Sequence, residues 1–203
     1  MSKTFIAVVG EEQKEFTVYT DVAMRSSKFF QAALTRDWIE SRTNRVTLKE
    51  VSAIHFENYL QWLSTNDSSH LDEFGMREAA KLYILGDFLD DSAFRITMLS
   101  LFAKDAIGNN RYPSNAIVTP AWEQTPENSP LRKIIVEIWI TSSIKTMATR
   151  FAGIEKDVPK EFIVDCLHRV SETQARSTER MTNEDRKRAI ESRRDEVLKE
   201  LDV

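Results

Sequence analysis

The sequence is poor in cysteine and glycine and has no long hydrophobic run, which excludes several kinds of site. Cys166 is the only cysteine in 203 residues, so an intramolecular disulfide and a cysteine-rich zinc site are both excluded. The five glycines form no GxGxxG or GxxxxGK(S/T) run, so nothing supports a bound nucleotide. The apolar stretches, such as 5–9 and 138–140, are far shorter than the roughly 20 residues of a spanning helix, and the N-terminus does not resemble a leader. We therefore expect no membrane partner and a cytoplasmic or nuclear location.

An excess of charge of one sign is also missing. The chain carries 28 basic and 32 acidic residues, a formal net charge of −4, so it has no overall electrostatic attraction for nucleic acid. Basic residues gather at 186–188 and 193–194, in a pattern similar to a weak nuclear-import signal or a phosphate-binding strip. Acidic neighbours cancel much of this field: Glu184, Asp185, Glu191, Asp195 and Glu196. A nucleic-acid partner is not expected, and a nuclear, transcription-associated interaction protein stays as an alternative.

Residues that carry catalysis or bind metals are few and scattered. His55, His70 and His168 have no serine or carboxylate at a spacing typical of a catalytic motif. Cys166 and His168 would project about 200° apart around a helix, which is poor geometry for a shared metal ion. The sequence therefore predicts no enzyme, no metal, no cofactor and no small-molecule substrate. A divergent enzyme is the alternative from another functional class.

The first half of the chain predicts an α+β domain. Residues 5–9 are apolar at every position and 16–19 alternate, which predicts a hairpin whose first strand is covered on both faces, and 46–48 predict a third strand. Apolar residues at helical spacing follow in four stretches: 29–34, 56–63, about 72–89 and 92–102. Gly108 ends the last of these helices. We expect the domain to span residues 1–107, with three strands and about five helices.

The second half predicts helices without strands. Four of the five prolines fall in 109–130, which indicates an extended connector with one short strand or helix at 116–118. The stretch 131–151 is apolar on nearly every side, so a helix there must be buried, and Pro159 opens a further helix. The predicted order is a connector at 108–130, a helical extension at 131–171 that packs on the domain, and a charged helix or partly disordered tail at 172–203.

Five pieces of the sequence, taken in order, resemble the BTB/POZ domain in the form common in small fungal proteins. They are FTVY (16–19), SKFFQAAL (27–34), WIES (38–41), VTL (46–48) and FENYLQWL (56–63). The stretch KLYILGD (81–87) resembles the late helix of that family, and TPENSPLR (125–132) resembles the segment that follows the domain. The chain departs from the family at Tyr19, where a histidine is usual, and at 64–66, where Tyr-Thr-Gly is usual.

The resemblance implies a small three-stranded sheet packed on a cluster of helices, and a protein–protein interaction module rather than an enzyme. It also implies homotypic or heterotypic association and, in many members, docking to a cullin-type scaffold as a ubiquitin-ligase adaptor. Leu71, Asp72 and Glu73 are similar to the hydrophobic-x-acidic cullin contact of some members. Because the first core strand already starts at Thr4, we expect no strand-swapped obligate dimer but a monomer or a weak homodimer.

Overall fold

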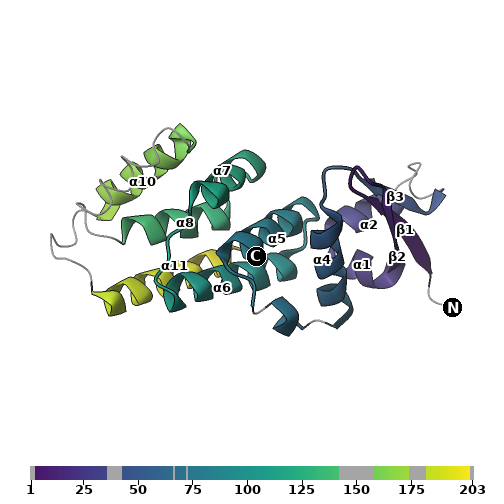
Figure 1. The fold of residues 1–203 in the computed structure, drawn as a ribbon, viewed down its shortest axis with the longest axis horizontal. Helices are drawn as coiled ribbons and strands as arrows, with labels where there is room; N and C mark the ends of the chain where they lie inside the picture. Colours follow the sequence, from purple (N-terminus) through teal and green to yellow (C-terminus); the bar gives the residue numbers. More distant parts are fainter. Residues whose placement is uncertain are drawn as a thin grey trace. The chain divides into compact units, whose positions relative to one another are not determined.

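The protein has an α+β fold with a small mixed sheet and many helices (Figure 1). The computed structural model describes residues 3–35, 43–65, 67–71, 73–141, 158–173 and 182–201. Within these ranges no helix has both the length and the apolar surface that a membrane crossing requires. The α+β class predicted from the sequence is therefore confirmed.

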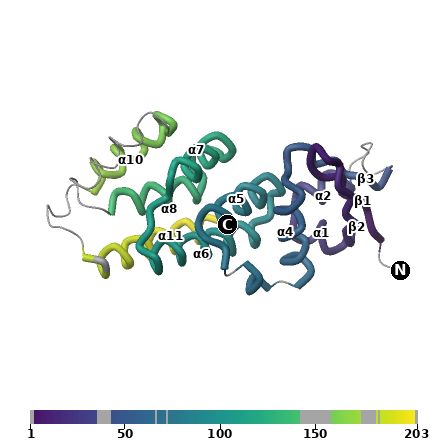
Figure 2. Tube along the Cα trace, in the orientation of Figure 1, coloured from purple at the N-terminus to yellow at the C-terminus, as the bar shows by residue number. Residues whose placement is uncertain are grey.

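The chain forms two compact units, and Figure 2 traces its path. The first unit comprises Met1–Glu73 and Lys81–Thr97, and the second comprises Phe74–Ala80 and Met98–Val203. Helices α5 (Met76–Phe88) and α6 (Ser92–Gly108) contribute residues to both. The first unit thus contains most of the domain expected over 1–107. The packing of 131–171 on that domain stays a prediction.

The sheet has three strands in the order β2-β1-β3. Strand β1 (Thr4–Val9) pairs antiparallel with β2 (Lys14–Tyr19), and it pairs parallel with β3 (Arg45–Leu48). The central position of β1 confirms the prediction made from its continuous apolar run, because a central strand is covered more fully than an edge strand. Phe5, Ala7 and Val9 are its fully buried residues.

Four short helical segments complete the N-terminal part of the first unit: α1 (Thr20–Ser26), α2 (Lys28–Thr35), α4 (Ala53–Thr65) and the 3-10 helix η1 (Ser69–Leu71). Aromatic rings fill the space between them, with Phe30 5.2 Å from Phe5 and 6.4 Å from Phe56, measured between ring centroids. On α4 the structure buries Trp62, whereas Leu60 and Leu63, expected to face inward, are only half-buried.

Helices α5 and α6 approach each other closely at Gly86. A Cβ atom at this position would lie 2.9 Å from Phe94 Cδ1 and 3.1 Å from Arg95 Cγ, so only glycine fits without movement of the neighbours. The sequence pattern predicted that α5 starts near Asp72, but the helix begins at Met76. The Met76 N–H donates to the Asp105 carboxylate at 3.0 Å, which satisfies one of the free donors at a helix start.

The second unit is helical in the part that the structure describes. Where the prolines suggested an extended connector, the structure has α7 (Asn115–Gln124), with Pro120 inside the helix. Proline has no N–H to donate to the carbonyl four residues earlier, and its ring crowds that carbonyl. The burial of Ile117, Val118, Ala121 and Trp122 favours the helix in spite of this cost. The helix expected as one of two alternatives at 116–118 is therefore present, but it is longer than predicted and replaces the extended chain over 115–124.

Helix α8 (Pro130–Ile140) is the centre of the second unit. It contacts α7, α10 (Lys160–Thr173) and α11 (Asn183–Leu201), and eight of its eleven residues are buried. This confirms that its all-round apolar surface is covered. The predicted continuation to residue 151 falls outside the described residues.

The charged C-terminal segment was predicted to be either a helix or partly disordered. Over Asn183–Leu201 it forms helix α11. Ile190 and Val197 are fully buried, and α11 packs along α8. Arg186 lies with its guanidinium 4.3 Å from the centroid of the Tyr112 ring and donates to the Arg111 carbonyl at 2.9 Å. The helix is therefore attached through a narrow stripe rather than solvated on all sides.

Candidate interaction surface

The triplet that the sequence suggested as a partner contact is divided by the structure. Leu71 ends η1 and is fully buried, so its side chain packs in the core of the first unit. Asp72 lies outside the described residues, and Glu73 is exposed. A partner contact at Glu73 stays a prediction, but the buried Leu71 side chain is not presented to a partner.

An apolar groove lies instead between α2 and the C-terminal end of α5. The rings of Phe29 and Phe88 meet there, with centroids 5.2 Å apart and planes tilted by 38°. Phe88 is 48% exposed, which is unusual for so large an apolar side chain. The open groove measures about 580 Å³ and is lined by Lys28, Phe29, Gln31, Ala32, Thr35, Phe88 and Asp90.

Hydrogen bonds fix the start of α2 against the loop after α5. The Ser27 hydroxyl donates to the Leu89 carbonyl at 2.6 Å and accepts from the Phe30 N–H at 3.1 Å, so it caps α2 while binding the other segment. The Lys28 N–H adds a bond to the Asp90 carbonyl at 3.2 Å. These bonds hold the two walls of the groove together.

Asp91, next to the groove, is a fully buried carboxylate that three segments share. It accepts hydrogen bonds from the Ser26 hydroxyl at 2.5 Å and the Tyr59 hydroxyl at 2.9 Å. Its other oxygen accepts the Phe94 N–H at 3.0 Å and so caps α6. Burial, together with the negative charge of Asp91, raises the pKa of Tyr59 far above its ordinary value. The network links α1, α4 and the start of α6 within the first unit.

The edges of the groove carry charges of both signs. Lys28 is exposed at one edge, and Asp90 at the other forms an ion pair with Arg95 at 3.5 Å. Arg95 also pairs with Asp87 at 2.7 Å, and both of these side chains are largely buried. An apolar floor with polar edges suits the side chains of another protein, since the centre of an interface is apolar and its rim is polar.

The residues weighed for catalysis or metal binding are not brought together. His55 lies on α4, His70 on η1 and His168 on α10, where it is exposed. Burial raises the pKa of the Cys166 thiol, so it is not an activated nucleophile. In the described ranges no three His, Cys, Asp or Glu side chains could hold a metal ion.

Two pairs of adjacent large apolar residues in the sequence indicate the groove, although helical spacing alone does not reveal it. Phe29 and Phe30 are adjacent on α2, and Phe88 and Leu89 are adjacent at the end of α5. Neighbours on a helix project about 100° apart, so one of each pair tends to leave the core. Phe30 and Leu89 are fully buried, while Phe29, expected inward, is half-buried.

Comparisons with known proteins add no relative. No family model matches the sequence. No curated protein matches it either. The groove at Phe29 and Phe88 therefore rests on its geometry alone.

Proposed function

We propose that this chain is a protein–protein interaction module of the BTB/POZ type, with no catalytic activity of its own. The observation that carries the proposal is the aromatic pair of the half-buried Phe29 and the exposed Phe88 in an open groove. A mixed sheet packed on short helices supports the same interpretation, because it agrees with the architecture that the resemblance implies. Exposed apolar groups of this kind mark sites of protein association.

A cullin-type scaffold is the first partner that we propose, as for an adaptor of a ubiquitin ligase. Its support is the resemblance of residues 16–63 and 81–87 to the BTB/POZ family, together with the helices α4 and α5 in the expected order. In this proposal the protein is cytoplasmic or nuclear and is a monomer or weak homodimer.

A binding experiment with three variants tests the proposal. The full chain and a purified cullin N-terminal domain are mixed at tens of micromolar and separated by size-exclusion chromatography with light scattering. We expect a complex with the unchanged chain, a loss with Phe88→Ala or Phe29→Ala, and no loss with Ile54→Ala, which removes an apolar side chain that is 66% exposed elsewhere on the first unit.

Two results would count against parts of the proposal. Absence of any complex with the unchanged chain would reject the cullin partner. A pulldown with the full chain, followed by mass spectrometry, would then ask whether stoichiometric protein partners are present and are lost with Phe88→Ala. A lone chain that retains a bound small molecule would favour the enzyme alternative.

The alternative of a nuclear, transcription-associated interaction protein has one supporting observation. Lys187 and Arg188 are exposed on α11, within the basic cluster that resembles an import signal. Against it, Arg186 is buried over Tyr112, and Arg193 and Arg194 form ion pairs with their own helix. Exclusion of the fluorescently tagged full chain from the nucleus would remove this alternative.

A further inference from the structure

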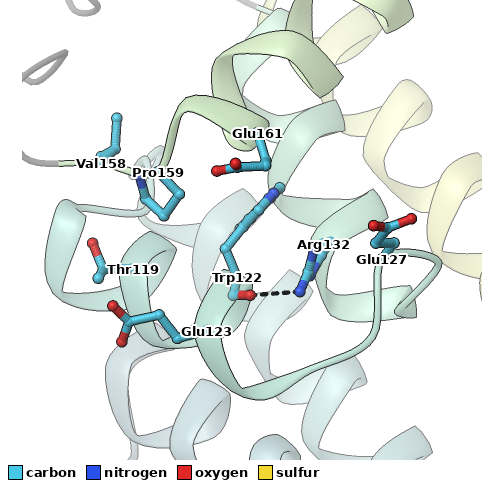
Figure 3. Close-up of a pocket in the computed structure, with 8 residues that line it drawn as sticks. All are labelled: Thr119, Trp122, Glu123, Glu127, Arg132, Val158, Pro159 and Glu161. Atoms are coloured by element: carbon cyan, nitrogen blue, oxygen red, sulfur yellow. Dashed lines mark hydrogen bonds between the residues drawn. The ribbon is translucent and has the colours of Figure 1, made fainter.

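The second unit contains an open pocket between α7, the start of α8 and the start of α10 (Figure 3). It measures about 570 Å³ and is lined by Thr119, Trp122, Glu123, Glu127, Arg132, Val158, Pro159 and Glu161. Its apolar surface comes from Trp122, Val158 and Pro159. Figure 3 shows Trp122 between Glu161 and Glu123, with Glu127 on the far side of Arg132. The pocket thus combines an apolar wall with a rim of three carboxylates.

Arg132 does not neutralise this rim by direct contact. It donates to the carbonyl oxygens of Trp122, at 2.6 Å, and of Thr125, and to the Thr125 hydroxyl at 3.2 Å. Its guanidinium also lies 5.4 Å from the centroid of the Trp122 ring. These acceptors are at the C-terminal end of α7, where free carbonyls and the helix dipole favour a positive charge. The chain itself therefore places a cation at the back of this pocket.

The acidic groups around Arg132 indicate that the electrostatic potential in the pocket is negative. Burial lowers the pKa of Arg132, whereas the negative charges of Asp165, Glu127 and Glu161 oppose that effect. Arg132 is 7% exposed and forms no ion pair with a carboxylate of the described residues, so nearby acidic groups favour its charge only from a distance. That field extends into the open part of the pocket, because Glu123, Glu127 and Glu161 are exposed on its rim.

The rim carboxylates have capacity for a second cation. No ion pair joins Glu123, Glu127 or Glu161 to a basic side chain in the described part of the chain, although many other acidic residues there are paired. Glu161 offsets the positive end of α10, but the other two belong to the end of α7 and the loop after it. The four charged residues that line the pocket sum to −2, three glutamates against one arginine.

We propose that this pocket binds an arginine side chain carried, beside apolar residues, by a segment of a partner protein. The arginine stem would lie against Pro159 and Val158, and its guanidinium would reach the rim carboxylates, for which its planar donors are suited. A bare metal ion fits less well, since no three acidic side chains in the described ranges could hold one. Polyanions are repelled by the same charges. The proposal is independent of the groove at Phe29 and Phe88.

Nuclear magnetic resonance of the full chain tests this proposal with a defined probe. The probe is the peptide acetyl-Leu-Arg-Leu-amide, and the readout is the assigned indole N–H signal of Trp122, whose proton is donated to Asp165 at 3.0 Å. We expect this signal to shift and saturate at millimolar peptide. The peptide with citrulline in place of arginine keeps the shape but loses the charge, and it should leave the signal in place. Equal binding of both peptides, or no shift, would overturn the proposal.

Variants of the protein supply the matched control. The triple variant Glu123→Gln, Glu127→Gln and Glu161→Gln removes the charges of the rim. It should lower the affinity for the arginine peptide roughly tenfold, as expected for three partly exposed ionic contacts. The control triple Glu11→Gln, Glu12→Gln and Glu50→Gln changes the net charge equally at exposed sites of the first unit and should bind like the unchanged chain. Equal affinity in both triples would overturn the proposal. Equal affinity for acetyl-arginine-amide and the tripeptide would reject a protein segment as the occupant.

Discussion

The ring of Phe29 on α2 contacts the ring of Phe88 on α5, with the ring centroids 5.2 Å apart. The next residue in the chain after each of them, Phe30 and Leu89, is completely buried. The aromatic pair is held at the surface by residues that are fixed in the core. A side chain in this position contributes little to the stability of the isolated protein. It is available to fill a cavity of a partner at small cost in side-chain entropy, since its conformation is already restricted.

Phe88→Ala is expected to separate binding from stability. Since Phe88 is 48% exposed, its loss should lower the free energy of unfolding by only about 1 kcal/mol, whereas Phe30→Ala should cost about 3–5 kcal/mol. Urea unfolding followed by circular dichroism measures both. A cost for Phe88→Ala as large as that for Phe30→Ala would mean that the Phe29–Phe88 pair serves the core and not a partner.

The buried Asp91 is expected to be among the most sensitive positions of the first unit. Asp91→Ala leaves the hydroxyls of Tyr59 and Ser26 and the Phe94 N–H without their acceptor, which should cost about 3 kcal/mol or more. Asp91→Asn keeps one acceptor oxygen and should cost less. The exposed Asp21→Asn is the control and should change the midpoint of urea unfolding very little. Similar midpoints for all three variants would contradict the shared-acceptor role.

Tyr59 predicts a specific loss of stability in alkali. Its pKa is raised by burial and by Asp91 from an ordinary value of 10.0, so above that pH the unfolded chain releases the tyrosine proton while the folded chain keeps it. The free energy of unfolding should therefore be unaffected by this group below about pH 10 and fall above it, by about 1.4 kcal/mol per pH unit. Tyr59→Phe removes this contribution. The free energy of unfolding is measured against pH for the unchanged chain and for Tyr59→Phe. Two curves that stay parallel between neutral pH and pH 12 would contradict the raised pKa of Tyr59.

Gly86→Ala tests the close approach of α5 and α6. Alanine is the better helix former by about 1 kcal/mol, so propensity alone predicts stabilisation. The new methyl group would lie 2.9 Å from the Phe94 ring, and we expect the resulting movement to destabilise the protein by about 1–3 kcal/mol net. Gly108→Ala, where nothing lies within 4 Å, is the matched control. A rise in melting temperature with Gly86→Ala would show that the helices separate without cost.

Ile190→Ala tests whether α11 is part of the core of the second unit. Ile190 is fully buried, so its truncation should cost about 2–4 kcal/mol, while Lys187→Ala on the exposed side should cost almost nothing. Thermal unfolding of the full chain compares the two. Indistinguishable melting temperatures would return α11 to the solvated tail that its charge suggested.

The sequence was informative where one pattern determined one structure. The uninterrupted apolar run of 5–9 predicted a central strand, because such a strand must be covered on both faces. The all-round apolar surface of 131–151 predicted a buried helix, which the structure shows over Pro130–Ile140. Asp91 stands directly before α6, the helix that it caps. Its contacts with Ser26 and Tyr59 could not be predicted, since they depend on how distant segments meet.

Composition misled where packing overrode it. Pro120 suggested an extended chain, yet four apolar neighbours keep α7 helical. The charges of α11 suggested solvation, yet two buried residues and Arg186 are enough to attach it. The pocket beside Trp122 had no signal in the sequence, because its acidic residues come from two stretches far apart in the chain, 123–127 and 161.

The shared carboxylate of Asp91 also has a consequence for synthesis on the ribosome. Its hydrogen-bond donors Ser26 and Tyr59 precede it by 65 and 32 residues, so both emerge long before their acceptor. Until the start of α6 has been translated, Ser26 of α1 and Tyr59 of α4 lack the carboxylate that they share. The nascent chain is therefore expected to remain incompletely folded, with its aromatic core open to chaperones, for most of the synthesis of the first unit.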